Sequence, residues 1–220
     1  MTKKRRQKEY EAQPYTKNIL PRNKKQEEFI KALGEYPVVF GIGAAGTGKT
    51  FLSVVQAILE YEKETINRIL LVRPAVTTEK LGYLPGDLDD KLDPFMRPLF
   101  DALHQRWAPK RIDNMIEYGE IELASLAYMR GRTFDNCALI FDEAQNSTID
   151  QMKMLLTRLG DNVKCMINGD PQQTDISGTN GLVWAAQKLE TCSSVSIVKF
   201  DKKDVVRSKL TKQLIHYLEA

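Results

Sequence analysis

Residues 43–50 read GAAGTGKT, a phosphate-binding loop pattern in which Gly43 and the run Gly48-Lys49-Thr50 are separated by four residues. An apolar run at 38–42 precedes the loop, and apolar residues at helical spacing follow it, namely Phe51, Leu52, Val55, Ile58 and Leu59. The pattern predicts a buried strand that turns through the loop into a helix. Because that unit is typical of α/β proteins with a parallel sheet, it constrains the fold strongly.

The loop residues have the chemistry that a nucleoside triphosphate requires. Small residues let the main chain curl round the phosphates and present its N–H groups, and the following helix adds the positive end of its dipole. Lys49 is expected to reach the β- and γ-phosphates, and Thr50 to offer its hydroxyl to Mg²⁺. We therefore expect ATP or GTP with Mg²⁺, bound by Gly43, Ala44, Ala45, Gly46, Thr47, Gly48, Lys49 and Thr50.

Two carboxylates follow a second apolar run. Residues 137–141 read CALIF and deliver Asp142 and Glu143 at the end of a predicted buried strand. Open α/β sheets bind their ligands at the carboxyl ends of the strands. Asp142 is placed to hold Mg²⁺, directly or through a water, and Glu143 to orient and polarise the water that attacks the γ-phosphorus.

The remaining patterns predict one parallel sheet flanked by helices. Apolar runs indicate strands at 69–72, 163–167 and 195–198, and helical patterns separate them. The section 77–132 is longer than a simple crossover requires, so it predicts an insertion of helices that carries a substrate-facing surface.

Further helical segments are expected outside the phosphate loop. Residues 23–33 form the first, and 94–107 and 111–118 form two more within the insertion. Ser147 followed by Asp150 resembles a capping box at the start of a further helix, in which a Met and Leu stripe packs into the core.

Length and charge divide the chain in two. With 220 residues it can bury one sizeable core, so we expect a single domain at 23–220 and a basic arm at 1–22. Nine Lys or Arg stand against two Glu in residues 1–25, although the whole chain carries only +3. Such an arm is either a solvated terminus or a tether that contacts the phosphates of RNA or DNA.

The composition also indicates where the protein works. No run approaches the ~20 apolar residues of a membrane span, and no apolar segment follows the charged start, so we expect no membrane partner and a cytoplasmic protein. Cys137, Cys165 and Cys192 lack metal-ligand or redox spacing, which favours core packing in a reducing compartment. We expect no structural metal.

Two further polar segments are candidates for catalysis. Residues 169–175 read GDPQQTD after the predicted strand at 163–167, where Gln173 can contact the γ-phosphate or the attacking water. An ordinary Asp-Pro turn is the alternative. Arg207 precedes a predicted amphipathic helix and is a candidate arginine finger for a neighbouring subunit, with Arg158 as a weaker one; both could instead be surface arginines.

These segments together resemble the PhoH-like ATPases, the phosphate-starvation-inducible family. The resemblance runs from about Gln26 to the C-terminus and is carried by GYLPGD at 82–87, DPFMRPL at 93–99, FDEAQN at 141–146, QMKMLLTR at 151–158, PQQT at 171–174 and DVVRS at 204–208. It implies a P-loop NTPase with a RecA-like core related to superfamily 1 helicases. It also implies ATP hydrolysis, a homo-oligomeric ring such as a hexamer, and single-stranded RNA as the suspected partner, through helicase or nuclease activity.

The family's functional residues map onto this sequence. Gln26 resembles the glutamine that reads adenine, Gln173 the γ-phosphate sensor and Arg207 the arginine donated in trans, and Asp142 and Glu143 form the second motif. The chain has Arg207-Ser208 where members commonly carry Arg-His. No RNA-binding or nuclease domain is expected beside the core, which argues against a stand-alone nuclease.

Three functions are consistent with the sequence. The first is an oligomeric ATPase coupled to single-stranded RNA or DNA. The second is a nucleotide-gated binding or regulatory module with slow turnover, against which Glu143 argues. The third, a small-molecule kinase, is disfavoured because the insertion lacks an Arg-dense lid pattern.

Overall fold

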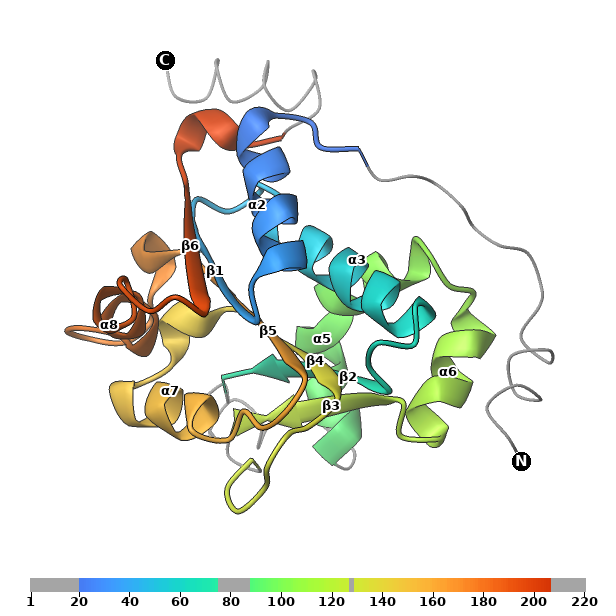
Figure 1. The fold of residues 1–220 in the computed structure, drawn as a ribbon. Coiled ribbons are helices and arrows are strands. Elements are labelled where there is room, and N and C mark those ends of the chain that lie inside the picture. The colour runs from blue at the N-terminus through green and yellow to red at the C-terminus, as the bar shows by residue number, and fades with distance from the viewer. Residues whose placement is uncertain (1–19, 75–87, 127–128, 207–220) are drawn as a thin grey trace.

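A computed structural model describes residues 20–74, 88–126 and 129–206. In this part of the chain, six parallel strands form one sheet with the order β3-β2-β4-β5-β1-β6 (Figure 1). The strands are β1 Val38–Gly43, β2 Arg68–Arg73, β3 Ile121–Ser125, β4 Cys137–Phe141, β5 Val163–Gly169 and β6 Val195–Phe200. The predicted parallel α/β sheet is confirmed.

Helices cover both faces of the sheet. Their bounds are α2 Lys24–Glu35, α3 Lys49–Glu62, α5 Leu88–His104, α6 Pro109–Glu117, α7 Ile149–Leu156 and α8 Gly181–Lys188. Helices α2, α3, α5 and α6 share one apolar cluster, and α7 and α8 belong to the cluster on the opposite face (Figure 1). The sheet is therefore the middle layer of three.

The central strands explain why the sequence shows continuous apolar runs. In β4, Ala138 and Ile140 pack on the α3 side, whereas Cys137, Leu139 and Phe141 pack on the α7 side. A strand buried on both faces has no polar alternation. All five β4 side chains are buried, and this fixes the position of the polar residues that follow them.

Two cysteines fill the core as expected. Cys137 and Cys165 are buried on neighbouring strands, while Cys192 is exposed. Burial raises the pKa of the Cys137 thiol to about 11, and it raises the pKa of Cys165 as well. Both thiols are therefore protonated at neutral pH and pack as small apolar groups.

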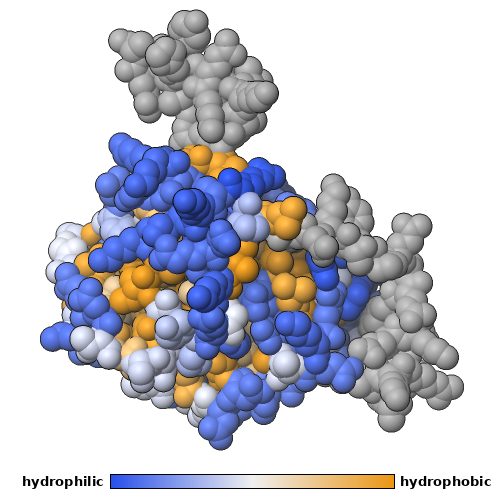
Figure 2. All heavy atoms as spheres, turned by 45° about the horizontal axis from the view of Figure 1, so that its top comes forward, coloured by the Kyte–Doolittle hydropathy of each residue, from blue (hydrophilic) through white to orange (hydrophobic). Residues whose placement is uncertain are grey.

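The surface shows mixed polarity. Hydrophilic side chains surround smaller apolar patches on the face in Figure 2. Among the described helices, none has the length and apolar character needed to cross a membrane.

Strand β3 is absent from the elements that the sequence predicts. The sequence of 77–132 predicts helices at 94–107 and 111–118, and α5 and α6 lie there with bounds shifted toward the N-terminus. Its residues 121–125, however, pair in parallel with β2 at the edge of the sheet. Glu122 in the middle of this strand forms an ion pair with Arg132, so the edge strand lacks a continuous apolar signal.

The predicted helix start at Ser147 is wrong by one residue. Thr148 caps α7, because its Oγ1 accepts from the Gln151 N–H at 3.2 Å while Gln151 Oε1 accepts from the Thr148 N–H at 2.8 Å. Ser147 instead donates to the Ala144 carbonyl at 2.6 Å. A 3₁₀ turn, η2 Ala144–Asn146, stands between the carboxylates and this helix and shifts the start.

We predict that Gly41→Ala destabilises the fold. A Cβ at Gly41 in β1 would lie 2.7 Å from Asn168 Oδ1 and 2.9 Å from Phe29 Cζ, so both side chains would have to shift. Such overpacking costs about 1–3 kcal/mol of unfolding free energy. Urea denaturation of the parent protein and of Gly41→Ala measures this loss of unfolding free energy.

Gly34→Ala is the matched control. Gly34 lies in α2, and a Cβ there would meet nothing within 4 Å. This change should stabilise the protein by about 0.5–1 kcal/mol, because alanine favours a helix over glycine. Equal effects of the two substitutions would contradict the packing argument.

Candidate active site

The phosphate loop connects β1 to α3 in a conformation that requires glycine at key positions. Gly43 has φ 131°, and a Cβ there would lie 1.9 Å from the Phe200 carbonyl oxygen of β6. Gly48 has φ 90° and caps α3 without a side-chain hydrogen bond. The first N–H groups of α3 thus have no capping side chain at Gly48, which suits an anionic ligand.

Lys49 folds back onto the loop. Its Nζ donates to the Gly43 carbonyl at 2.7 Å, to the Ala44 carbonyl at 2.9 Å and to Thr47 Oγ1 at 3.2 Å. Burial lowers the pKa of Lys49, and the nearby carboxylates of Asp170, Asp142 and Glu143 partly oppose this. The carbonyls hold the ammonium at the loop, within reach of an incoming anion.

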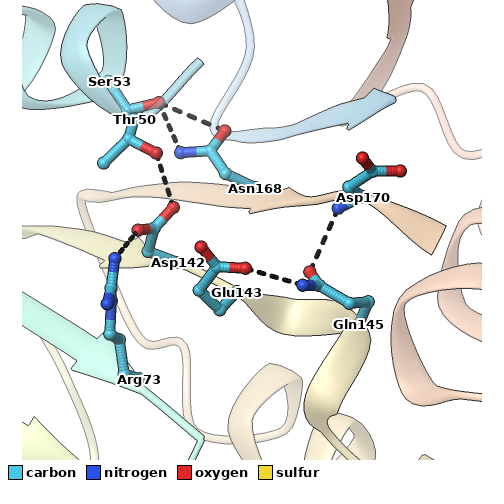
Figure 3. A network of polar contacts seen from close by, with 8 residues as sticks. All are labelled: Thr50, Ser53, Arg73, Asp142, Glu143, Gln145, Asn168 and Asp170. Atoms are coloured by element: carbon cyan, nitrogen blue, oxygen red, sulfur yellow. Dashed lines mark hydrogen bonds and ion pairs between the residues drawn. The ribbon is translucent and has the colours of Figure 1, made fainter. Parts of the chain in front are cut away.

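Thr50 and Asp142 meet at the first turn of α3. Thr50 Oγ1 donates to Asp142 Oδ1 at 2.6 Å, and Arg73 Nη2 donates to Asp142 Oδ2 at 2.5 Å (Figure 3). Mg²⁺ prefers hard oxygen ligands, and a hydroxyl and a carboxylate in contact form such a set. The residues present therefore fit the predicted magnesium site. Arg73 did not emerge from the sequence, since its role depends on the pairing of β2 with β4.

Glu143 stands where the chain leaves β4 and turns sharply. Its φ of 56° is left-handed, and this conformation directs the chain into η2. Gln145 Nε2 donates to Glu143 Oε2 at 2.6 Å, and Gln145 Oε1 accepts from the Asp170 N–H at 3.1 Å (Figure 3). Gln145 is 1% exposed, so a buried amide fixes the carboxylate to the chain after β5. Gln145 was not predicted as a site residue, although it belongs to the FDEAQN segment.

The segment after β5 forms a short 3₁₀ helix, η3 Pro171–Gln173, that begins at Asp170. Asp170 Oδ1 accepts from the Gln172 N–H at 3.0 Å, and Oδ2 accepts from the Ala45 N–H of the phosphate loop at 3.2 Å. The carbonyl of Gln173, the last residue of η3, accepts from Gln145 Nε2 at 3.4 Å. The turn is therefore tied to the phosphate loop and to Gln145, and the role of Gln173 at the γ-phosphate stays a prediction.

Gln26 lies behind the phosphate loop. Its Nε2 donates to the Thr47 carbonyl at 2.9 Å, and its Oε1 accepts from the Arg22 N–H at 2.9 Å. It is 5% exposed and lies so near Gly48 that a Cβ there would come within 2.8 Å of Nε2. Gln26 thus braces the loop, and its adenine-reading role stays a prediction.

The candidate arginines differ in what the structure describes. Arg207 lies outside the described residues, but the Val206 N–H just before it donates to the Gly46 carbonyl at 3.0 Å. Arg158 follows α7, and its Nη1 contacts the Arg132 carbonyl at 3.5 Å, before the amino end of β4. Arg158 is thus far along the sheet from the phosphate loop of its own chain.

A cavity of about 280 Å³ joins these groups. Its walls come from the phosphate loop, the start of α3, helix α5 and the chain after β4 and β5; they are Ala45, Gly46, Gly48, Lys49, Thr50, Phe51, Pro98, Asp142, Glu143, Gly169, Asp170 and Gln173. The phosphate loop, the Thr50–Asp142 pair and the Glu143 carboxylate therefore line one space.

Known proteins with similar sequences identify the family. The family model of the PhoH-like protein matches residues 18–219. The chain is 46% identical over 202 residues to the PhoH-like protein of Bacillus subtilis (strain 168), and 42% identical over 206 residues to Protein PhoH of Escherichia coli (strain K12). These matches cover 90% and 91% of this chain but 63% and 58% of the relatives, so the chain spans about three fifths of their length.

A solved structure supports the fold. The large terminase of a thermophilic bacteriophage, in complex with ADP, aligns with a TM-score of 0.54 over 88% of this chain and 49% of its own, at 15% identity. Together with the parallel sheet and the loop after β1, this likeness shows a P-loop NTPase fold of the RecA-like type. Because the family model matches nearly the whole sequence, the chain belongs to the PhoH family.

Proposed function

We propose that this protein binds ATP with Mg²⁺, hydrolyses it, and couples hydrolysis to single-stranded RNA or DNA as a homo-oligomer. One observation carries the proposal: the phosphate loop, the Thr50–Asp142 pair, Glu143 and Gln173 open into one cavity. If residues 43–50 were only a glycine-rich turn without a ligand, the fold would not require these four groups to line one cavity. The terminase with a similar fold was solved in complex with ADP, which supports a nucleotide as the ligand.

The phosphates would lie along the loop. Backbone N–H groups and the start of α3 face the cavity, and Lys49 would exchange its carbonyl partners for the β- and γ-phosphate oxygens. Thr50 and Asp142 would hold Mg²⁺, which supplies positive charge to the phosphates when bound. Gln26 would read the adenine, after its amide gives up one of its present contacts.

Glu143 would orient the attacking water and accept a hydrogen bond from it. Gln145 holds one carboxylate oxygen at 2.6 Å, which leaves the other oxygen for the water. Gln173 lines the same cavity and would contact the γ-phosphate or the water. Since Gln145 also bonds to Asp170, a change at the γ-phosphate would reach both motifs together.

A second subunit would complete the site. A helicase-type motor places two RecA-like cores around one nucleotide, and the described part of this chain forms one. Arg207 would then enter a neighbouring subunit's site. In a closed ring, such as a hexamer, every site would receive an arginine from its neighbour, and we expect this ring to work in the cytoplasm. The basic arm at 1–22 adds charge that suits nucleic-acid phosphates.

The test is the steady-state ATPase rate with and without single-stranded RNA and DNA, with the solution mass measured by light scattering. An oligomer whose rate rises with nucleic acid is the expected result. A monomer that hydrolyses ATP at full rate would contradict the ring. A nucleotide-binding protein that nucleic acid does not stimulate would instead indicate the gated binding module.

Glu143→Gln should retain ATP and nearly stop turnover. The amide keeps the shape of the side chain but cannot act as a base, so kcat should fall about 10²–10⁴-fold with little loss of nucleotide affinity. Lys49→Ala should lose nucleotide binding instead. Turnover and fluorescent-nucleotide titration separate the two effects; an unchanged kcat in Glu143→Gln would remove Glu143 from the reaction.

Asp170→Asn should tighten ATP binding more than ADP binding. The Asp170 carboxylate bonds to the Ala45 N–H in the loop, where it repels the charge of an incoming triphosphate. Asparagine keeps an oxygen that can cap η3 but removes the charge, so we expect about a three- to tenfold gain for ATP. Nucleotide titrations at low and high salt measure it. Equal weakening for ATP and ADP would mean that the side chain mainly shapes the site.

A further inference from the structure

Arg73 and Asp142 are neighbours because of strand register. Arg73 ends β2 and Asp142 follows β4, while Val72 pairs with Phe141 and the Asp142 N–H donates to the Val72 carbonyl at 2.9 Å. Parallel pairing brings the two side chains together, and Nη2 lies 2.5 Å from Oδ2 (Figure 3). Their side chains are only 15% and 5% exposed, so the pair is largely shielded from solvent.

Each oxygen of Asp142 has a partner within the protein. Oδ1 accepts from Thr50 and Oδ2 from Arg73. Lys49 is directed to the loop carbonyls. A buried carboxylate without a nearby positive charge is costly, and the Arg73 guanidinium supplies that charge.

A metal ion would change this balance. Mg²⁺ at Thr50 and Asp142 would bring two positive charges beside a guanidinium that contacts the same carboxylate. Repulsion between them is stronger in a shielded site than in water. The Arg73 guanidinium, which stabilises the Asp142 carboxylate in this arrangement, would thus oppose the binding of Mg²⁺ at Asp142.

We propose that Arg73 is a placeholder cation, which neutralises Asp142 in the metal-free protein and competes with Mg²⁺ for it. This inference rests on the magnesium site of the proposed function. Arg73 is a positioning residue, since it acts through Asp142. Metal loading would release its guanidinium from Asp142, which lines the cavity, at the carboxyl end of β2.

The test measures binding of a fluorescent, non-hydrolysable ATP analogue, mant-AMPPNP, over a range of free Mg²⁺ that begins in EDTA. In Arg73→Gln the free Mg²⁺ concentration that gives half of the Mg²⁺-dependent increase in analogue binding should fall about three- to tenfold, because the competing charge is gone. Binding of the analogue in EDTA should weaken, since a positive charge near the phosphates is lost. If Arg73 had a purely structural role, Arg73→Gln would weaken binding of the analogue in EDTA and would also raise the Mg²⁺ concentration that binding requires.

Arg106→Gln is the matched control. Arg106 pairs with Glu62 at 2.7 Å and has a similarly shielded side chain, 16% exposed, but its partner Glu62 does not line the phosphate cavity as Asp142 does. Both measurements should equal those of the parent protein. Arg73→Lys keeps the charge with different geometry, so its Mg²⁺ concentration for half-maximal binding should lie between those of the parent and of Arg73→Gln. This second variant preserves the test if Arg73→Gln fails to fold.

Two results would overturn the inference. A higher Mg²⁺ requirement in Arg73→Gln would show that Arg73 supports the metal site by orienting Asp142, as an outer partner of a ligand does. An unchanged requirement would show that the two cations do not interact. If the parent protein itself binds the analogue equally with and without Mg²⁺, or not at all, the magnesium site of the proposed function fails first, and that outcome is visible without any variant.

Discussion

The parallel pairing of β1, β5 and β4 is the constraint on which the site depends. The phosphate loop follows β1, Asp170 follows β5 and the Asp142-Glu143 pair follows β4, so the three carboxyl ends bring these groups to one edge. A parallel pair needs a long crossover, and these crossovers are the helices that cover the sheet. The layers that stabilise the fold therefore also fix the distances within the cavity.

The sequence was sufficient for the parts whose signal is local. Gly43–Thr50 chemistry, the apolar runs and the carboxylates after β4 could be predicted because each depends on neighbouring residues. Edge strand β3 could not, since Glu122 interrupts its apolar pattern and only pairing with β2 makes it a strand. Arg73 and Gln145 were missed for a related reason: Arg73 acts on Asp142 and Gln145 bonds to Asp170, and tertiary structure brings both of these partners close.

The protein's own groups occupy much of the bonding capacity that ligands would use. Lys49 bonds to carbonyls, Asp170 to a loop N–H, and Arg73 to Asp142. Such internal contacts prevent the cost of unpaired buried charges, and each must be exchanged when a ligand arrives. Affinity is then a difference between two sets of bonds, which makes the site sensitive to single charges.

Both ends of the described chain meet beside the phosphate loop. Asn23, the cap of α2, donates to the Asp204 carbonyl at 3.0 Å, and Val206 bonds to Gly46 (Figure 1). A segment that continues from either of these two points is therefore joined to the domain beside this loop. Tension on such a segment would pull directly on the loop backbone, so mechanical load and phosphate binding would act on the same few peptide bonds.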